Sequence, residues 1–266
     1  EVLQVLESGT AQIIVGTHAL FQEEVNFFRL GLAVVDEQHR FGVVQRSELY
    51  RKGSKIDILM MTATPIPRTL TLTLYGDQDV SVIDELPPGR KSVRTVLRSP
   101  DRRELIFEFA ANQVREGRQI YVVYPLVEES EKMDLKSASE GYEELRHGLL
   151  AEFSTGLLHG RMATEEKAEV MDAFKSGEIQ VLCSTTVIEV GVDVPNATLM
   201  IVEHAERFGL AQLHQLRGRV GRGSEQSYCI LVNYAQSGDS GALQRLNTLC
   251  TSQDGFEIAQ KDLEIR

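Results

Sequence analysis

Leu32-Ala33-Val34-Val35-Asp36-Glu37 is a short, unbroken apolar run that stops at two adjacent acids. Such a run is typical of a strand buried on both faces, as in a parallel sheet. Similar runs recur along the 266-residue chain and alternate with stretches of helical spacing. The sequence therefore predicts an α/β fold of βαβ units around mainly parallel sheets. The predicted strands span residues 12–17, 31–37, 57–64, 93–98, 119–127, 155–159, 179–185, 197–203 and 226–232.

Two predicted helices have clear end signals. Ser99 and Pro100 are typical of an N-cap and first helical position, and Gly117 of the left-handed stop after a helix. A second helix begins near Thr164, with acids in its first turn, and ends before Gly177. We interpret residues 128–136 as a charged surface loop and 239–254 as a helix after the last strand.

Pro87 and Pro88 interrupt both sheet and helix, since each proline fixes φ and removes a backbone donor. We place a domain boundary there. Residues 1–88 and 89–236 are predicted as two α/β domains, and 237–266 as the start of a helical element.

Composition limits the possible partners. The net charge of −11 repels polyanions, so any nucleic-acid contact must come from local arginines or backbone amides. No window approaches the ~18 apolar residues of a membrane span. The three cysteines include no CxxC pair, which fits a reducing compartment and buried thiols.

The acids that end the first quoted run are candidate catalytic residues. At the carboxyl end of a parallel strand, Asp36 could hold hydrated Mg²⁺ while Glu37 orients or deprotonates water. An ordinary strand-to-loop exit has the same pattern. Thr62 and Thr64 follow the next strand and are expected at the same sheet edge, although a turn before proline also explains them.

The strongest single signal is Gln215-Leu216-Arg217-Gly218-Arg219-Val220-Gly221-Arg222. On a helix, Gln215, Arg219 and Arg222 would share one face, opposite an apolar one. Two converging guanidiniums suit the γ-phosphate of a triphosphate, as in an arginine finger. A solvated arginine face is the alternative. The interposed glycines are poor helix formers and indicate close backbone approach.

Three further turns could contact phosphates. Residues 184–195 form a strand-to-helix turn whose hydroxyls and amides could receive a phosphate, and Asp193 could accept from a ribose hydroxyl. A capped, buried helix explains this turn equally well. Residues 16–18 and 159–161 are polar, glycine-containing turns that could contact a nucleic-acid backbone. No GxxxxGK[ST] motif occurs in the chain.

Together these motifs resemble the superfamily 2 helicases, with motif II at 36–39, motif III at 62–64, motif V at 184–193 and motif VI at 215–222. Within the superfamily the chain is similar to the RecG family of branched-DNA helicases over nearly its whole length. Residues 84–90, 159–162, 185–193 and 208–216 carry this likeness. The transcription-repair coupling factors, which are double-stranded DNA translocases, share residues 65–69 and motif VI.

The resemblance implies two RecA-like domains, the first one incomplete, with ATP and Mg²⁺ between them. Asp36 would hold Mg²⁺ through water, and Glu37 would polarise the attacking water. The other implied catalytic residues are Gln215, Arg219 and Arg222. The implied nucleotide-binding residues are Asp36, Glu189, Gly191, Asp193, Arg219 and Arg222. The implied DNA-binding residues are Thr17, His18, His159, Gly160, Arg161, Thr185 and Thr186.

The resemblance also implies a branched DNA partner, a bacterial cytoplasmic location and no membrane. Thr62 and Thr64 would couple hydrolysis to motion, and a helical hairpin after motif VI would transmit that motion to duplex DNA. The chain opens where motif Ib belongs, so motif I and the wedge that splits branched DNA are missing. We therefore expect a fragment that alone neither hydrolyses ATP nor unwinds DNA. A non-catalytic nucleic-acid or protein-binding module is the alternative.

Overall fold

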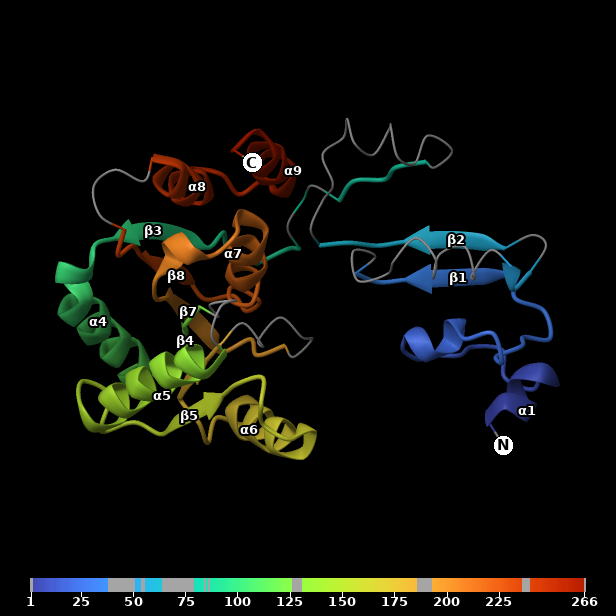
Figure 1. Ribbon diagram of the computed structural model, residues 1–266, viewed down its shortest axis with the longest axis horizontal. Coiled ribbons are helices and arrows are strands. Elements are labelled where there is room, and N and C mark those ends of the chain that lie inside the picture. The colour runs from blue at the N-terminus through green and yellow to red at the C-terminus, as the bar shows by residue number, and fades with distance from the viewer. Residues whose placement is uncertain are drawn as a thin grey trace. The chain divides into compact units, whose positions relative to one another are not determined.

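A computed structural model describes residues 2–37, 51–53, 56–63, 79–83, 85, 87–125, 131–185, 193–235 and 240–265 of the chain, without the side chains of 131–137 and 240. The chain divides into two compact units, residues 1–65 and 66–266 (Figure 1). The domain boundaries predicted from the sequence, at 88/89 and 236/237, stay a prediction.

The first unit contains a helix, α1 (Val2–Glu7), and two parallel strands, β1 (Leu32–Val35) and β2 (Asp57–Met60). The strand predicted at 12–17 was wrong, because this segment pairs with no strand of the described chain. Ile13 and Val15 are 87% and 94% exposed. Thr17 instead caps a short 3-10 helix, His18–Phe21, by accepting a hydrogen bond from the Ala19 N–H at 3.5 Å.

The second unit is built around a six-stranded sheet whose strand order is β3-β8-β7-β4-β6-β5. Every neighbouring pair is parallel. The α/β class predicted from the sequence is therefore confirmed. The strands are β3 (Arg94–Arg98), β4 (Gln119–Val123), β5 (Thr155–Leu158), β6 (Val181–Ser184), β7 (Ala197–Val202) and β8 (Tyr228–Val232).

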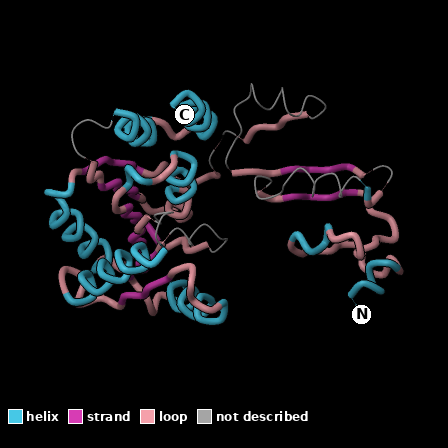
Figure 2. The backbone as a smooth tube through the Cα atoms, viewed as in Figure 1, coloured by secondary structure: helices cyan, strands magenta, loops and turns pink. Residues whose placement is uncertain are grey.

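Helices connect these strands and follow the last one (Figure 2). Gly117 and Gly177 have φ +84 and +86, so both predicted helix stops are confirmed. A 3-10 turn at Pro100–Arg102 precedes the first of these helices. The helices are α4 (Arg103–Arg115), α5 (Glu131–His147), α6 (Thr164–Ser176), α7 (Leu210–Arg217), α8 (Ser240–Thr251) and α9 (Gly255–Ile265).

The predicted surface loop at 128–136 was wrong from residue 131 onward, where α5 begins; residues 128–130 lie outside the described chain. The charged start of α5 hides its amphipathic character. Its buried positions, Ala138, Gly141 and Leu145, come later and have helical spacing. The helix predicted over 239–254 is in fact α8, which ends at Thr251, and α9 begins at Gly255.

Both faces of the larger sheet are covered. On one face α4 and α5 pack over β4 through side chains such as Phe107, Leu145 and Ile120. On the other face α6 to α9 pack through side chains such as Phe174 and Leu213. Of the three cysteines, Cys183 and Cys229 are buried as predicted and Cys250 is half-buried. In the described parts of the chain, no helix has the length and apolar character to cross a membrane.

Candidate active site

The acid pair lies directly after β1. Asp36 is exposed, and its Oδ1 accepts a hydrogen bond from the Glu37 N–H at 2.9 Å. The Glu37 backbone has φ +52, a left-handed conformation that costs a residue with a side chain about 1 kcal/mol. Strained backbone of this kind persists where the surrounding structure holds it, often near functional groups.

Thr62 is brought to the same edge of the smaller sheet. Val35 pairs with Met60, and the Met61 N–H donates to the Val35 carbonyl at 2.8 Å. Thr62 therefore follows its strand alongside the acids, as the sequence led us to expect. Thr64 and His39 lie outside the described residues. No group of three His, Cys, Asp or Glu side chains in the described chain could hold a metal by itself.

Only the first part of motif VI, residues 215–217, lies on α7. Helix α7 ends at Arg217, so the helical placement considered for residues 213–222 was wrong beyond that point. Gly218 caps the helix and Gly221 has φ +77, which a helix does not allow. Gln215 thus stays on α7, whereas Arg219 and Arg222 lie on the following turn.

The structure brings the end of motif V to this turn. Arg222 Nη1 lies 3.5 Å from Asp193 Oδ1, and the two side chains are 30% and 58% exposed. Tyr121 of β4 is 1% exposed, and the charges of Arg219, Arg222 and Asp193 all act on it. Burial raises the Tyr121 pKa to about 12, although the positive charges of Arg219 and Arg222 act to lower it. The Arg222–Asp193 contact thus brings one motif VI arginine to the end of motif V.

The ends of β5 and β6 form a second polar edge. The Thr185 N–H donates to the Leu158 carbonyl at 3.2 Å, which places Thr185 beside the start of the turn at His159. Thr185 Oγ1 and His159 Nδ1 are buried, and neither has a hydrogen-bond partner within the described chain. Desolvation lowers the His159 pKa, and the Lys167 charge adds to this.

The turn after β5 presents an exposed cation. Arg161 is exposed, and the Gly160 carbonyl accepts a hydrogen bond from Lys167 Nζ at 2.7 Å. Thr186, Glu189 and Gly191 fall outside the described chain. Of the predicted DNA-binding residues in the first unit, Thr17 and His18 are both exposed, at the start of the 3-10 helix.

Sequence reasoning missed a buried ion-pair network at the end of β7. Glu203 has a 2% exposed side chain, and its Oε1 accepts from Arg103 Nε at 2.9 Å. Tyr234 donates to Glu203 Oε2 at 2.8 Å, and Glu144 pairs with Arg103 at 2.6 Å. Burial opposes the Arg103 charge, but both glutamates raise its pKa. The one signal available in the sequence was an acid directly after an apolar strand.

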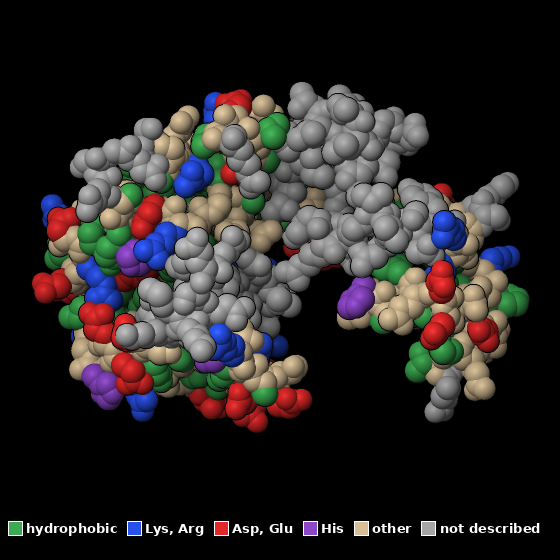
Figure 3. All heavy atoms as spheres, viewed as in Figure 1, with side chains coloured by type: hydrophobic (Ala, Val, Ile, Leu, Met, Phe, Trp, Pro, Cys, Tyr) green, Lys and Arg blue, Asp and Glu red, His purple; other side chains and the backbone are tan. Residues whose placement is uncertain are grey.

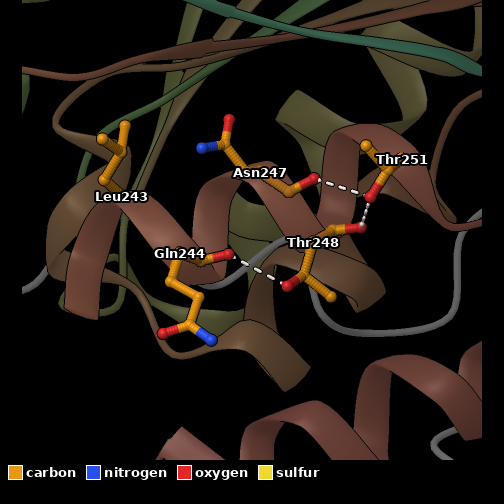
Figure 4. Close-up of a pocket in the computed structure, with 5 residues that line it drawn as sticks. All are labelled: Leu243, Gln244, Asn247, Thr248 and Thr251. Carbon is orange, nitrogen blue, oxygen red and sulfur yellow. Dashed lines mark hydrogen bonds between the residues drawn. The ribbon is translucent and has the colours of Figure 1, made fainter. Parts of the chain in front are cut away.

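Two surface features contain none of the predicted site residues. Carboxylates gather over α6 (Figure 3), at Glu165, Glu166, Glu169 and Asp172, so this face repels phosphates. A shallow hollow on α8 (Figure 4) is lined by Leu243, Gln244, Asn247, Thr248 and Thr251. Its two threonine hydroxyls donate to carbonyls of the same helix.

Two family models match the chain. The DEAD/DEAH box helicase model covers residues 1–73, and the helicase conserved C-terminal domain model covers residues 101–224. Together with the parallel sheets, they define the class as a superfamily 2 helicase core of RecA-like architecture. Within that class, the chain is homologous to the RecG helicases over nearly its whole length.

The individual relatives give the extent of this homology. ATP-dependent DNA helicase RecG of Synechocystis sp. is 56% identical over 98% of this chain and 31% of its own length. RecG of Bacillus subtilis is 50% identical over 100% of this chain and 39% of its own length. A solved structure of RecG bound to a three-way DNA junction has a TM-score of 0.79 and 49% identity, over 100% of this chain and 34% of that one. The chain thus spans about a third of the length of these relatives.

Proposed function

We propose that this chain is the core segment of an ATP-dependent DNA helicase or translocase that remodels branched DNA in repair and recombination. The observation that carries the proposal is homology to RecG helicases along 98–100% of the chain, with the acid pair and the motif VI arginines intact. Forked DNA, ATP and Mg²⁺ are the proposed partners and cofactors.

Asp36 and Glu37 are proposed to serve the metal and the attacking water. An exposed carboxylate after a parallel strand fits Mg²⁺, which keeps several waters and takes few protein ligands. Asp36 would hold the ion through water, and Glu37 would orient and deprotonate the water that attacks the γ-phosphate. When bound, Mg²⁺ supplies positive charge to the phosphate oxygens. Thr62, at the same edge of the smaller sheet, would couple ATP hydrolysis at the acid pair to motion of the chain.

Arg219 and Arg222 are proposed to stabilise charge on the γ-phosphate, with Gln215 and Asp193 as neighbours. The loose pairing of Arg222 with Asp193 supports this role. Since both side chains are partly exposed, their ion pair is worth ~1 kcal/mol or less, and phosphate oxygens could replace the carboxylate. Glu189 and Gly191 complete the proposed nucleotide-binding set.

The polar edge at β5 and β6 is proposed to grip the DNA backbone. Arg161 supplies an exposed positive charge at this edge, where Thr185 and His159 follow the ends of β6 and β5. Thr17, His18, Gly160 and Thr186 complete this proposed set. Because the chain carries a net charge of −11, contacts of this local kind must supply the attraction.

The test is ATP turnover by the full-length gene product without DNA, with linear duplex and with forked DNA. We expect forked DNA to stimulate turnover most; equal stimulation by linear duplex favours a coupling-factor type of translocase. Glu37→Gln should lower kcat by ~100-fold or more, with ATP binding retained. Arg222→Ala should lower kcat by ~1000-fold. Absence of ATP turnover in the wild-type protein would reject the enzyme and leave a binding module.

A further inference from the structure

The segment after the tandem prolines leads to the motif VI turn. Residues 87–90 form a tight turn in which the Arg90 N–H donates to the Pro87 carbonyl at 3.1 Å. Pro88 and Gly89 occupy its central positions, and Gly89 has φ +82, the arrangement typical of a type II turn. Proline and glycine thus fix the direction in which the chain leaves this turn at Arg90.

Arg90 bonds to the backbone of motif VI. Its Nε donates to the Gly221 carbonyl at 2.7 Å, across 131 residues of sequence. The contact is partly buried and its donor is charged, so it is stronger than a neutral hydrogen bond in water. The Gly221 carbonyl and the Arg222 nitrogen belong to one planar peptide unit. The Arg90 bond therefore fixes the orientation of the peptide plane between Gly221 and Arg222.

Close packing holds the same turn from a second side. A Cβ atom on Gly221 would lie 2.6 Å from Val93 Cγ2, so only glycine allows this approach. The segment that carries Val93 is itself anchored at separate points. Gln226 Nε2 donates to the Ser92 carbonyl at 2.9 Å, and Gln253 Nε2 donates to the Val93 carbonyl at 2.8 Å.

The contacts of Arg222 itself are looser. Its Nε lies 3.3 Å from the Gly218 carbonyl, and its Nη1 lies 3.5 Å from Asp193 Oδ1. Bonds of this length between partly exposed groups hold a long side chain weakly. The direction of the Arg222 guanidinium therefore depends on the backbone that precedes it, which Arg90 and Val93 hold.

We propose that Arg90 is a positioning residue for Arg222. By holding the Gly221 peptide, it presents the Arg222 guanidinium to the terminal phosphate of a bound nucleoside triphosphate. The inference rests on the proposed function of Arg222. Arg90 acts through the backbone, so its loss should impair turnover far more than nucleotide binding. A displacement of ~1 Å at a catalytic group can cost up to ~100-fold in rate.

The test uses DNA-stimulated ATP turnover by the full-length gene product. Arg90→Ala should lower kcat by ~10-fold or more and change the KM for ATP by less than about threefold. It should weaken binding of ADP–aluminium fluoride, which mimics the transferring phosphoryl group, without weakening binding of ADP. Arg90→Lys should recover only part of kcat, because an ammonium lacks the planar Nε donor. Arg98→Ala is the matched control, because it removes an exposed arginine that also donates to a backbone carbonyl, that of Leu97; it should keep kcat within about twofold.

A double-mutant cycle separates this inference from the proposed function. If Arg90 acts through Arg222, adding Arg90→Ala to Arg222→Ala should lower kcat no further. Wild-type turnover in Arg222→Ala would overturn the proposed function, and this inference with it. If the single variant Arg222→Ala is inactive but the single variant Arg90→Ala is fully active, the inference about Arg90 is overturned and the proposed function is not. Losses that multiply in the double variant overturn it as well.

Discussion

His214 shows how one residue on α7 adapts to a cationic neighbour. Burial lowers its pKa to about 4, the charge of Arg217 acts in the same direction, and Asp254 opposes them. His214 is therefore neutral in the folded chain at neutral pH. A neutral imidazole beside Arg217 avoids placing two positive charges together in a partly buried site.

The free energy of unfolding should consequently depend on pH through His214. An unfolded histidine has a pKa of ~6.5, so between that value and about 4 the unfolded chain binds the extra proton. Stability is present above pH ~6.5 and is lost as pH falls through this window. The wild type should therefore lose more unfolding free energy than His214→Gln when the pH falls from neutral to about 5. Allowing for partial exposure of His214, we expect this difference to be ~1 to 2 kcal/mol.

Thermal midpoints of the wild type and of His214→Gln, compared near neutral pH and near pH ~5, measure this difference. His147→Gln is the matched control, since that side chain is 73% exposed. Parallel pH dependence in the wild type and in His214→Gln would contradict the prediction.

At the scale of elements, one buried cation joins α7 to the end of α8. Arg217 is 4% exposed, and its Nη1 donates to the Leu249 carbonyl at 2.9 Å and to the Ser252 carbonyl at 2.8 Å. The last carbonyls of a helix have no partner within the helix. Arg217 supplies that partner from a neighbouring helix, and so fixes how α7 meets the turn between α8 and α9.

Arg217→Met should therefore destabilise the chain by ~2 to 4 kcal/mol, because it leaves two buried carbonyls without a donor. The measurement is the midpoint of urea unfolding. Arg207→Met, at an exposed position just before α7, should change stability by no more than ~0.5 kcal/mol. If the two variants unfold at the same urea concentration, water satisfies these carbonyls and the prediction fails.

Elements marked by local sequence signals were predicted from the sequence, and elements that depend on distant partners were not. The eight described strands are marked by apolar runs, and the two glycine stops by a backbone requirement; both are local signals. The segment at 12–17 has the same apolar character, but strands need partners, and pairing is not local. Motif VI was placed on a helix that glycine ends after Arg217.

Contacts to backbone carbonyls are harder to predict than contacts between side chains. Arg90 and Arg217 both donate to carbonyl oxygens, which every residue carries, so no residue type marks the acceptor. The pairing of Arg222 with Asp193 was easier to anticipate, because both belong to motifs with chemical character. The charged groups of the candidate site could thus be proposed from the sequence and stay a prediction, whereas a contact such as that of Arg90 with the Gly221 carbonyl could not be proposed.

At the scale of the whole molecule, the absent phosphate-binding loop leads to a separate prediction. No GxxxxGK[ST] motif occurs in the 266 residues, so the chain carries no lysine and glycine loop to cradle the β- and γ-phosphates. The purified 266-residue polypeptide should show no DNA-stimulated ATP turnover, whereas the full-length gene product should. Turnover by the isolated polypeptide, with Glu37→Gln as its inactive control, would contradict this.

The order of strands in the larger sheet has a consequence for how the chain emerges from the ribosome. Among the described strands, edge strand β3 pairs with β8 alone, and β8 is the last strand of this sheet to be translated. At roughly 5 to 20 residues per second, β3 leaves the exit tunnel on the order of ten seconds before its partner. During that interval Val96 and Leu97 of β3 have no neighbouring strand beside them, so this part of the new chain is open to pairing with other chains.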